Sequence, residues 1–128
     1  MYYCVQLSAE MKARIMNVYT FFFGFPDEDI WTRFCDHITI AHESHKDFLP
    51  ASKILNNFIG YTVKFKITGV GISENAIAFQ VNFGTLNPHS HITLFCKKGI
   101  PPVESNNITN WEKVYCKEEF EGKIAVRK

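Results

Sequence analysis

The chain has 128 residues, of which 46% are hydrophobic and 21% charged, and its formal net charge is +1. This length suits one domain, which we place at residues 1–128. The composition is that of a globular protein and not of a disordered one. The balanced charge argues against a protein that coats long nucleic acid, because such a protein needs a basic surface. It leaves room for a small anionic substrate that a few local groups hold.

Strand and helix patterns are mixed along the chain. Ser8 is suited to cap a helix that continues to about Tyr19, and residues 51–58 fit a short helix. Residues 42–50 and 99–107 are typical of loops. Alternating or β-branched segments predict about seven strands, at residues 2–7, 35–41, 61–69, 76–83, 90–96, 111–114 (a short strand or a turn) and 120–127. This order of elements predicts an α+β domain.

The cysteines and the apolar segments bear on the compartment. No basic-then-apolar leader stands at the start, and no apolar run approaches the length that crosses a bilayer. The four cysteines are scattered and form no Cys-x-x-Cys pair; they are Cys4, Cys35, Cys96 and Cys116. We therefore expect reduced thiols and a cytoplasmic protein without a membrane partner.

One short motif occurs twice. Residues 36–40 read Asp-His-Ile-Thr-Ile, and residues 90–94 read Ser-His-Ile-Thr-Leu. Both copies lie on predicted strands, where side chains two positions apart point to the same face. The histidine and the threonine of each copy should therefore share a face, opposite to the aliphatic residues. The four residues concerned are His37, Thr39, His91 and Thr93.

Two imidazoles and two hydroxyls at one point suit chemistry at a phosphodiester. An imidazole with a pKa of ~6.5 can act as acid or base at neutral pH. One histidine would accept a proton from the attacking hydroxyl or water while the other donates to the departing oxygen. The threonine hydroxyls would hold the non-bridging phosphate oxygens. Nothing in this scheme needs a metal or another cofactor, so we expect none.

Other interpretations of the histidines have less support. A single His-x-Thr would be read as an ordinary strand residue pair, and only the repeat favours function. Cys35, His37, His42 and His45 form a zinc set on paper, but their spacing lacks the usual paired form. No serine stands in a nucleophile elbow, and no glycine-rich loop precedes a helix.

The paired motif resembles the two-histidine (2H) phosphoesterase superfamily, in particular its LigT-like members and the cyclic phosphodiesterase domain of tRNA ligases. Residues 35–42, 90–106 and 120–126 resemble blocks of that branch, and the opening strand and helix fit its pattern. The resemblance implies a two-lobed fold of two antiparallel sheets with pseudo-two-fold symmetry around a central cleft, with the helices outside. It implies that His37 and His91 are the acid–base pair and that Thr39 and Thr93 bind phosphate.

The resemblance also suggests the substrate. We expect a metal-independent phosphodiesterase acting on a cyclic dinucleotide or a 2′-5′-linked immune messenger such as cyclic GMP-AMP, in a small stand-alone enzyme of viral immune evasion. The alternative within the enzymes is the 2′,3′-cyclic phosphate at RNA 3′ ends, in RNA processing or repair. The alternative from another class is a nucleotide-binding module without catalysis. We expect a monomer that needs no protein partner.

Candidate substrate-binding residues follow from the same picture. Tyr3 lies at a strand position that lines the cleft in this family, and Phe95 shares the face of His91 by alternation. Both aromatic rings are candidates to stack a base. His42 and Lys97 are candidates to approach the cleft rim or a phosphate. Ser105 and Asn106 are expected to fix the loop after the second motif.

Overall fold

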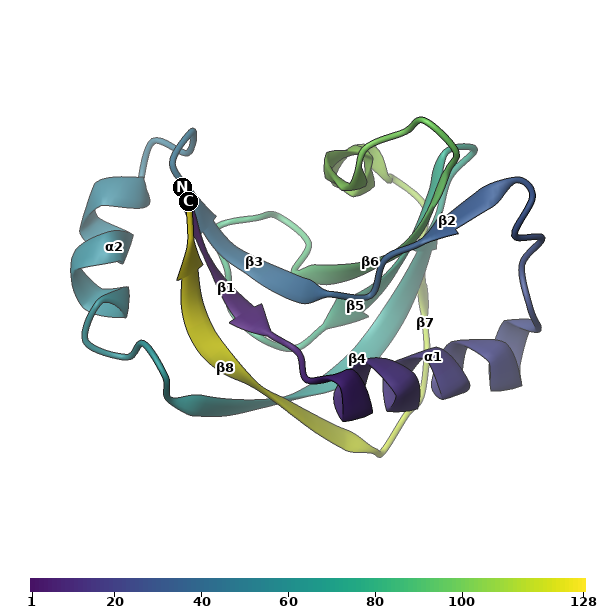
Figure 1. Ribbon diagram of the computed structural model, residues 1–128, viewed down its shortest axis with the longest axis horizontal. Coiled ribbons are helices and arrows are strands. Elements are labelled where there is room, and N and C mark those ends of the chain that lie inside the picture. The colour runs from purple at the N-terminus through teal and green to yellow at the C-terminus, as the bar shows by residue number, and fades with distance from the viewer.

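The computed structural model describes all 128 residues and shows an α+β fold dominated by antiparallel strands (Figure 1). Two α-helices and one 3-10 helix accompany the strands: α1 (Ala9–Phe23), α2 (Phe48–Leu55) and η1 (Pro102–Asn107). The strands are β1 (Tyr2–Gln6), β2 (Trp31–Arg33), β3 (His37–His42), β4 (Thr62–Ile72), β5 (Ala76–Val81), β6 (His91–Lys97), β7 (Trp111–Lys113) and β8 (Glu119–Arg127).

All eight strands belong to one sheet, which closes on itself. The order is β6-β3-β1-β8-β4-β5, and β5 pairs again with β6. The short strands are added at two places, β2 beside β6 and β7 beside β4. The family resemblance implies two sheets; the structure has one instead, because β3 and β6, the two motif strands, pair at Ile38 and Ile92. The two motif strands therefore lie side by side, and we call the line along which β3 and β6 pair the seam.

The core lies on the side of the seam that faces α1. Ser8 caps this helix as predicted, since its Oγ accepts a hydrogen bond of 3.2 Å from the backbone N–H of Met11. The helix continues four residues beyond Tyr19, to Phe23. Tyr19 is buried and its ring centroid lies 5.2 Å from that of Phe95. This packing leaves the opposite side of the motif strands free for a site, and η1 lies there (Figure 1).

Three elements differ from the prediction. The short helix α2 begins at Phe48, inside the segment predicted as loop, because the Phe48 side chain is buried against Tyr3 with ring centroids 5.9 Å apart. Strand β2 is only three residues long, too short for an alternation to show. Residues Pro102–Asn107, predicted as part of a loop, form the 3-10 helix η1.

Both motif strands carry the same irregularity. In β3 the ladder with β1 skips Ile40, and in β6 the ladder with β5 skips Leu94. Each is the residue after the motif threonine, so each motif ends in a β-bulge. After the bulge, Ala41 and Phe95 are buried together with the skipped residues. The repeat in sequence is thus a repeat in backbone geometry.

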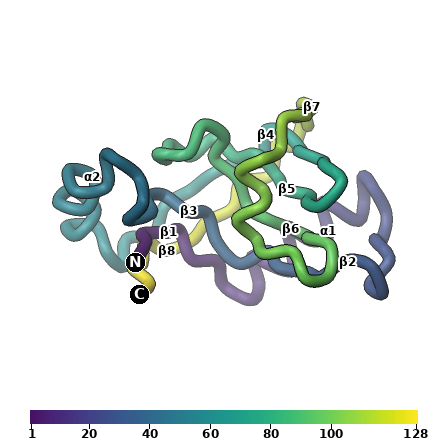
Figure 2. Tube along the Cα trace, turned by 90° about the horizontal axis from the view of Figure 1, so that it is seen from above, coloured from purple at the N-terminus to yellow at the C-terminus, as the bar shows by residue number.

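The chain ends come together at one edge of this arrangement. Tyr2 pairs with Arg127 across β1 and β8, and both figures of the whole chain show the two termini side by side (Figure 2). Both residues are part of the site described below. None of the four cysteines is bridged. No helix combines the length and the apolar character that crossing a membrane requires.

Candidate active site

A cavity of about 790 Å³ opens on the side of β3 and β6 that faces away from α1. All four residues of the paired motif line it, together with the start of β1, the end of β8, the β5–β6 connection and η1. Seventeen residues form its wall: Tyr2, Arg33, Phe34, Asp36, His37, Thr39, His42, Ser44, His45, Leu86, Asn87, His91, Thr93, Pro102, Val103, Asn106 and Arg127. The prediction that the two distant motifs meet is therefore confirmed as a matter of geometry.

Antiparallel pairing brings the two motifs into register. Because Ile38 pairs with Ile92, Thr39 lies opposite His91, and the same register places His37 next to Thr93. The two isoleucines point into the core and have no exposed surface. Each histidine thus has its own threonine two positions along the strand and the other motif's threonine across the seam.

His37 is held from behind by a carboxylate. Its Nδ1 lies 3.0 Å from Oδ2 of Asp36, and its Nε2 lies 3.1 Å from Oγ1 of Thr39. Since an ionised carboxylate only accepts hydrogen bonds, Nδ1 carries a proton and Nε2 is the atom that faces the cavity. The Tyr2 ring covers one side of the imidazole, with ring centroids 5.3 Å apart.

His91 is held by a backbone group instead. Its Nδ1 donates to the carbonyl of His89 at 2.7 Å, which again leaves Nε2 for the cavity. Trp111 of β7 stands 6.2 Å from the imidazole, between ring centroids. Both histidines therefore present the same nitrogen to the cavity, although their supporting partners differ.

The threonine of the second motif is fixed by η1. Oγ1 of Thr93 lies 2.8 Å from Oγ of Ser105 and donates a longer bond of 3.3 Å to the carbonyl of Pro102. Ser105 is 1% exposed and is the only polar side chain in the buried core. The sequence predicts a loop-fixing role for Ser105 and Asn106; the structure shows that Ser105 acts on Thr93 and that Asn106 lines the cavity.

Asp36 is the centre of a charged cluster beside the first histidine. Lys12 of α1 donates to Oδ1 at 2.8 Å, and Arg127 of β8 donates to Oδ2 at 2.6 Å. Arg127 also donates to the Tyr2 hydroxyl at 3.2 Å and to the Gln6 side chain. These bonds connect residues near both ends of the chain to Asp36, the residue before His37.

The pKa values follow from these contacts. Partial burial acts to raise the pKa of Asp36, but the bonds from Lys12, His37 and Arg127 outweigh it and hold the pKa well below its ordinary value. Burial lowers the pKa of His37 from its ordinary value, and Asp36 opposes this effect. Burial also lowers the pKa of His91, where only the His89 carbonyl opposes it. Asp36 is consequently ionised throughout the range in which the histidines titrate.

The charges around the cavity suit an anion. Arg33, Arg127 and four histidines line it, and Asp36 is the single carboxylate among the lining residues. Arg127 is occupied by Asp36, whereas Arg33 forms only an exposed ion pair of 3.2 Å with Glu28. Such an exposed pair is weak, so Arg33 is available to a phosphate group.

Two predicted substrate-binding residues, Tyr3 and Phe95, are buried and do not line the cavity. Tyr3 is buried, and its hydroxyl bonds to the Asn56 side chain; its neighbour Tyr2 lines the cavity instead. Phe95 is in the core because the bulge at Leu94 reverses the alternation after Thr93. The first prediction is wrong by one strand position, and the second is wrong because the residues after Thr93 on β6 do not line the cavity.

The remaining predicted residues divide. Lys97 is at the far end of β6, where it pairs with Trp31 and its ammonium lies 6.0 Å from that ring centroid, so it does not line the cavity. His42 does line the cavity, and its ring stacks on Tyr2 with centroids 6.2 Å apart. The possible zinc ligands Cys35, His37, His42 and His45 do not come together. Cys35 is buried, and no group of three or more His, Cys, Asp or Glu side chains is placed to hold a metal.

Several lining residues were not identified from the sequence. Asp36 opens the first copy of the motif where Ser90 opens the second, and this difference is a signal that the sequence contains. Tyr2, Arg33 and Arg127 carry no such signal, because tertiary pairing alone brings them to the cavity.

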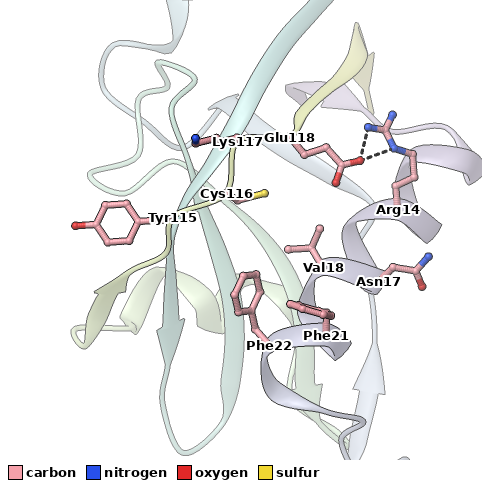
Figure 3. A pocket seen from close by; sticks show the side chains of 9 residues that line it. All are labelled: Arg14, Asn17, Val18, Phe21, Phe22, Tyr115, Cys116, Lys117 and Glu118. Carbon is pink, nitrogen blue, oxygen red and sulfur yellow. Dashed lines mark hydrogen bonds and ion pairs between the residues drawn. The ribbon is translucent and has the colours of Figure 1, made fainter.

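A second cavity of about 540 Å³ lies between α1 and the segment that joins β7 to β8 (Figure 3). It contains the ion pair between Arg14 and Glu118, at 2.6 Å, and the exposed rings of Phe21 and Phe22. No histidine and no motif residue lines it. All four residues of the paired motif therefore lie at the cavity beside β3 and β6, and none lies here.

No protein-family model matches the chain, no curated protein matches it, and no solved structure matches it.

Proposed function

We propose that the protein is a metal-independent phosphodiesterase that cleaves a ribose phosphodiester in a small nucleotide, as a two-histidine enzyme does. One observation carries this proposal. His37 and His91 are 54 residues apart in the sequence. Strands β3 and β6 bring them to one cavity together with Thr39 and Thr93, and Nε2 of both imidazoles faces this cavity. This arrangement has a base, an acid and two hydroxyl groups around one cavity.

The reaction needs no more than these groups. One imidazole removes the proton of the attacking oxygen, which is a water or the vicinal ribose hydroxyl, as that oxygen forms its bond to phosphorus. The other imidazole gives its proton to the oxygen whose bond to phosphorus breaks. Charge that develops on the non-bridging oxygens meets the Thr39 and Thr93 hydroxyls, the latter oriented by Ser105.

The cavity favours a substrate with more than a terminal phosphate. Its volume of about 790 Å³ is within the range of roughly 300–1,000 Å³ of small-molecule sites. Hydrogen-bonding side chains continue on both sides of the motif residues: Ser44 and His45 follow β3, and Asn106 belongs to η1. The stacked rings of Tyr2 and His42 also form part of the wall. These features support a cyclic dinucleotide or a 2′-5′-linked dinucleotide, with groups on both sides of the scissile phosphate.

Turnover of a substrate panel in the presence of a chelator tests the proposal. The panel contains 2′,3′-cyclic GMP-AMP, its 3′,3′-linked isomer, 2′-5′ oligoadenylate and an RNA that ends in a 2′,3′-cyclic phosphate. We expect cleavage of at least one 2′-5′-linked compound at an unchanged rate in EDTA, with products identified by mass. A linear monophosphate identifies water as the nucleophile, and a cyclic phosphate identifies the ribose hydroxyl.

The other outcomes are equally informative. Cleavage of the RNA end alone would assign the protein to RNA processing, and the RNA end would then replace the dinucleotide as the proposed substrate. Loss of turnover in EDTA, restored by a divalent metal, contradicts the mechanism. Binding of a panel member without turnover assigns the cavity to a nucleotide-binding module.

A further inference from the structure

We propose that the two histidines have fixed and different roles: His37 is the general acid, Asp36 is its positioning residue, and His91 is the general base. This inference rests on the proposed phosphodiesterase function. The two histidines occupy the same position in the two copies of the motif. The pairing of β3 with β6 also places each histidine opposite the threonine of the other copy. The groups behind them break this equivalence.

The support of His37 favours its protonated form. Its Nδ1 donates to the Asp36 carboxylate at 3.0 Å, and an anion at this distance stabilises an imidazolium. Asp36 cannot turn away easily, because Lys12 and Arg127 hold its two oxygens from different elements. The residue before it, Cys35, has φ +57°, a backbone conformation that is uncommon outside glycine. The chain is bent at this point between β2 and β3, which brings the carboxylate behind the imidazole.

The support of His91 fixes a tautomer without adding a charge. The His89 carbonyl accepts the Nδ1 proton at 2.7 Å, so the neutral ring has its lone pair on Nε2, toward the cavity. No carboxylate contacts this imidazole. A neutral imidazole that presents Nε2 is ready to accept a proton, which is the state that a base needs at the start of the reaction.

Other polar and charged groups surround His37, and two of them, Lys12 and Arg127, oppose the effect of Asp36. They come from every element that packs near the ring: the Tyr2 phenol on β1, Lys12 on α1, His42 on β3, His91 on β6 and Arg127 on β8. The cations among them lower the pKa of His37, whereas Asp36 raises it. Removing Lys12 and removing Asp36 should therefore shift the pKa of His37 in opposite directions.

The first measurement does not depend on turnover. NMR titration gives the pKa of each imidazole, with assignments from the single His→Ala variants. We expect Asp36→Asn to lower the pKa of His37, which is a loss of roughly tenfold or more in proton affinity, and to leave that of His91 unchanged or slightly raised. Lys12→Met should raise the pKa of His37. Asp29→Asn, at an exposed turn, is the matched control and should move neither.

The second measurement separates acid from base through the leaving group. A p-nitrophenolate departs without a proton, whereas a ribose alkoxide needs one. On the dinucleotide, His37→Ala should lose roughly 10²–10⁴-fold in kcat, but less than about tenfold on uridine 3′-(p-nitrophenyl phosphate). His91→Ala should lose activity on both substrates. Asp36→Asn should follow the pattern of His37→Ala with a smaller loss on the dinucleotide.

The outcomes distinguish this inference from the function on which it rests. If the p-nitrophenyl ester rescues His91→Ala and not His37→Ala, the roles are reversed and the inference is wrong although the enzyme is a phosphodiesterase. If the pKa of His37 is unchanged in Asp36→Asn, Asp36 is not a positioning residue for His37. If the wild-type protein cleaves neither substrate, the proposed function fails, and the acid and base roles fail with it.

Discussion

Replacing either motif histidine by alanine is expected to reduce kcat by roughly 10²–10⁴-fold, the range for loss of a general acid or base. Both His37→Ala and His91→Ala should show this loss on the dinucleotide, because each leaves one proton transfer without a partner. The double variant should lose little more than the worse single variant, since two groups that act in one transition state are not additive. Steady-state kinetics of the three variants, in EDTA, measures the effect.

Lys53→Ala is the control for these variants. Lys53 belongs to α2, is exposed and does not line the cavity. The substitution should keep kcat within a few-fold of the wild-type value. A full rate in His91→Ala, with an unchanged melting temperature, would show that the second motif is a structural strand and not part of a catalytic pair.

Replacing Phe95 by alanine is expected to lower the free energy of unfolding by about 3–5 kcal/mol, the usual cost of removing a buried phenylalanine. Phe95 is 1% exposed, and its ring packs on Tyr19 in the core under α1. Urea denaturation measures the change. Phe21→Ala is the matched control, because that ring is 83% exposed, and it should change the free energy by less than about 0.5 kcal/mol.

The Phe95→Ala variant also distinguishes the position that the sequence predicts for this ring, at the substrate, from the position that the structure shows, in the core. If Phe95 touched the substrate, as the alternation of residues 90–96 predicts, Phe95→Ala would raise KM in a protein of nearly normal stability. The structure predicts the opposite: a destabilised protein whose folded fraction keeps its KM. A raised KM without a loss of stability would contradict the bulge at Leu94.

The paired motif was predictable because its information is local. Residues two apart on a strand share a face, so one line of sequence places His37 beside Thr39 and His91 beside Thr93. The helix after Ser8 was predictable for the same reason, from its cap and its apolar spacing. That the two strands meet follows only from their pairing at Ile38 and Ile92, which the repeat suggested and the structure supplies.

The rest of the site depends on contacts that no local pattern carries. Arg127 reaches Asp36 over 91 positions, because β1 lies between β3 and β8. A shift of one residue in β1 exchanges Tyr3 for Tyr2 at the cavity. A one-residue bulge in β6 turns Phe95 inward. Alternation predicts faces correctly until a bulge intervenes, and the positions of bulges depend on the neighbouring strands.

A crystal structure with a slowly cleaved phosphorothioate analogue of the cleaved dinucleotide would test the convergence of the two motifs most directly. We expect the phosphorus between the two imidazoles, with Nε2 of His37 and Nε2 of His91 each within about 3 Å of an oxygen bound to it. The Thr39 and Thr93 hydroxyls should contact the non-bridging atoms. Phosphorus bound away from β3 and β6, or in contact with one histidine only, would contradict the account.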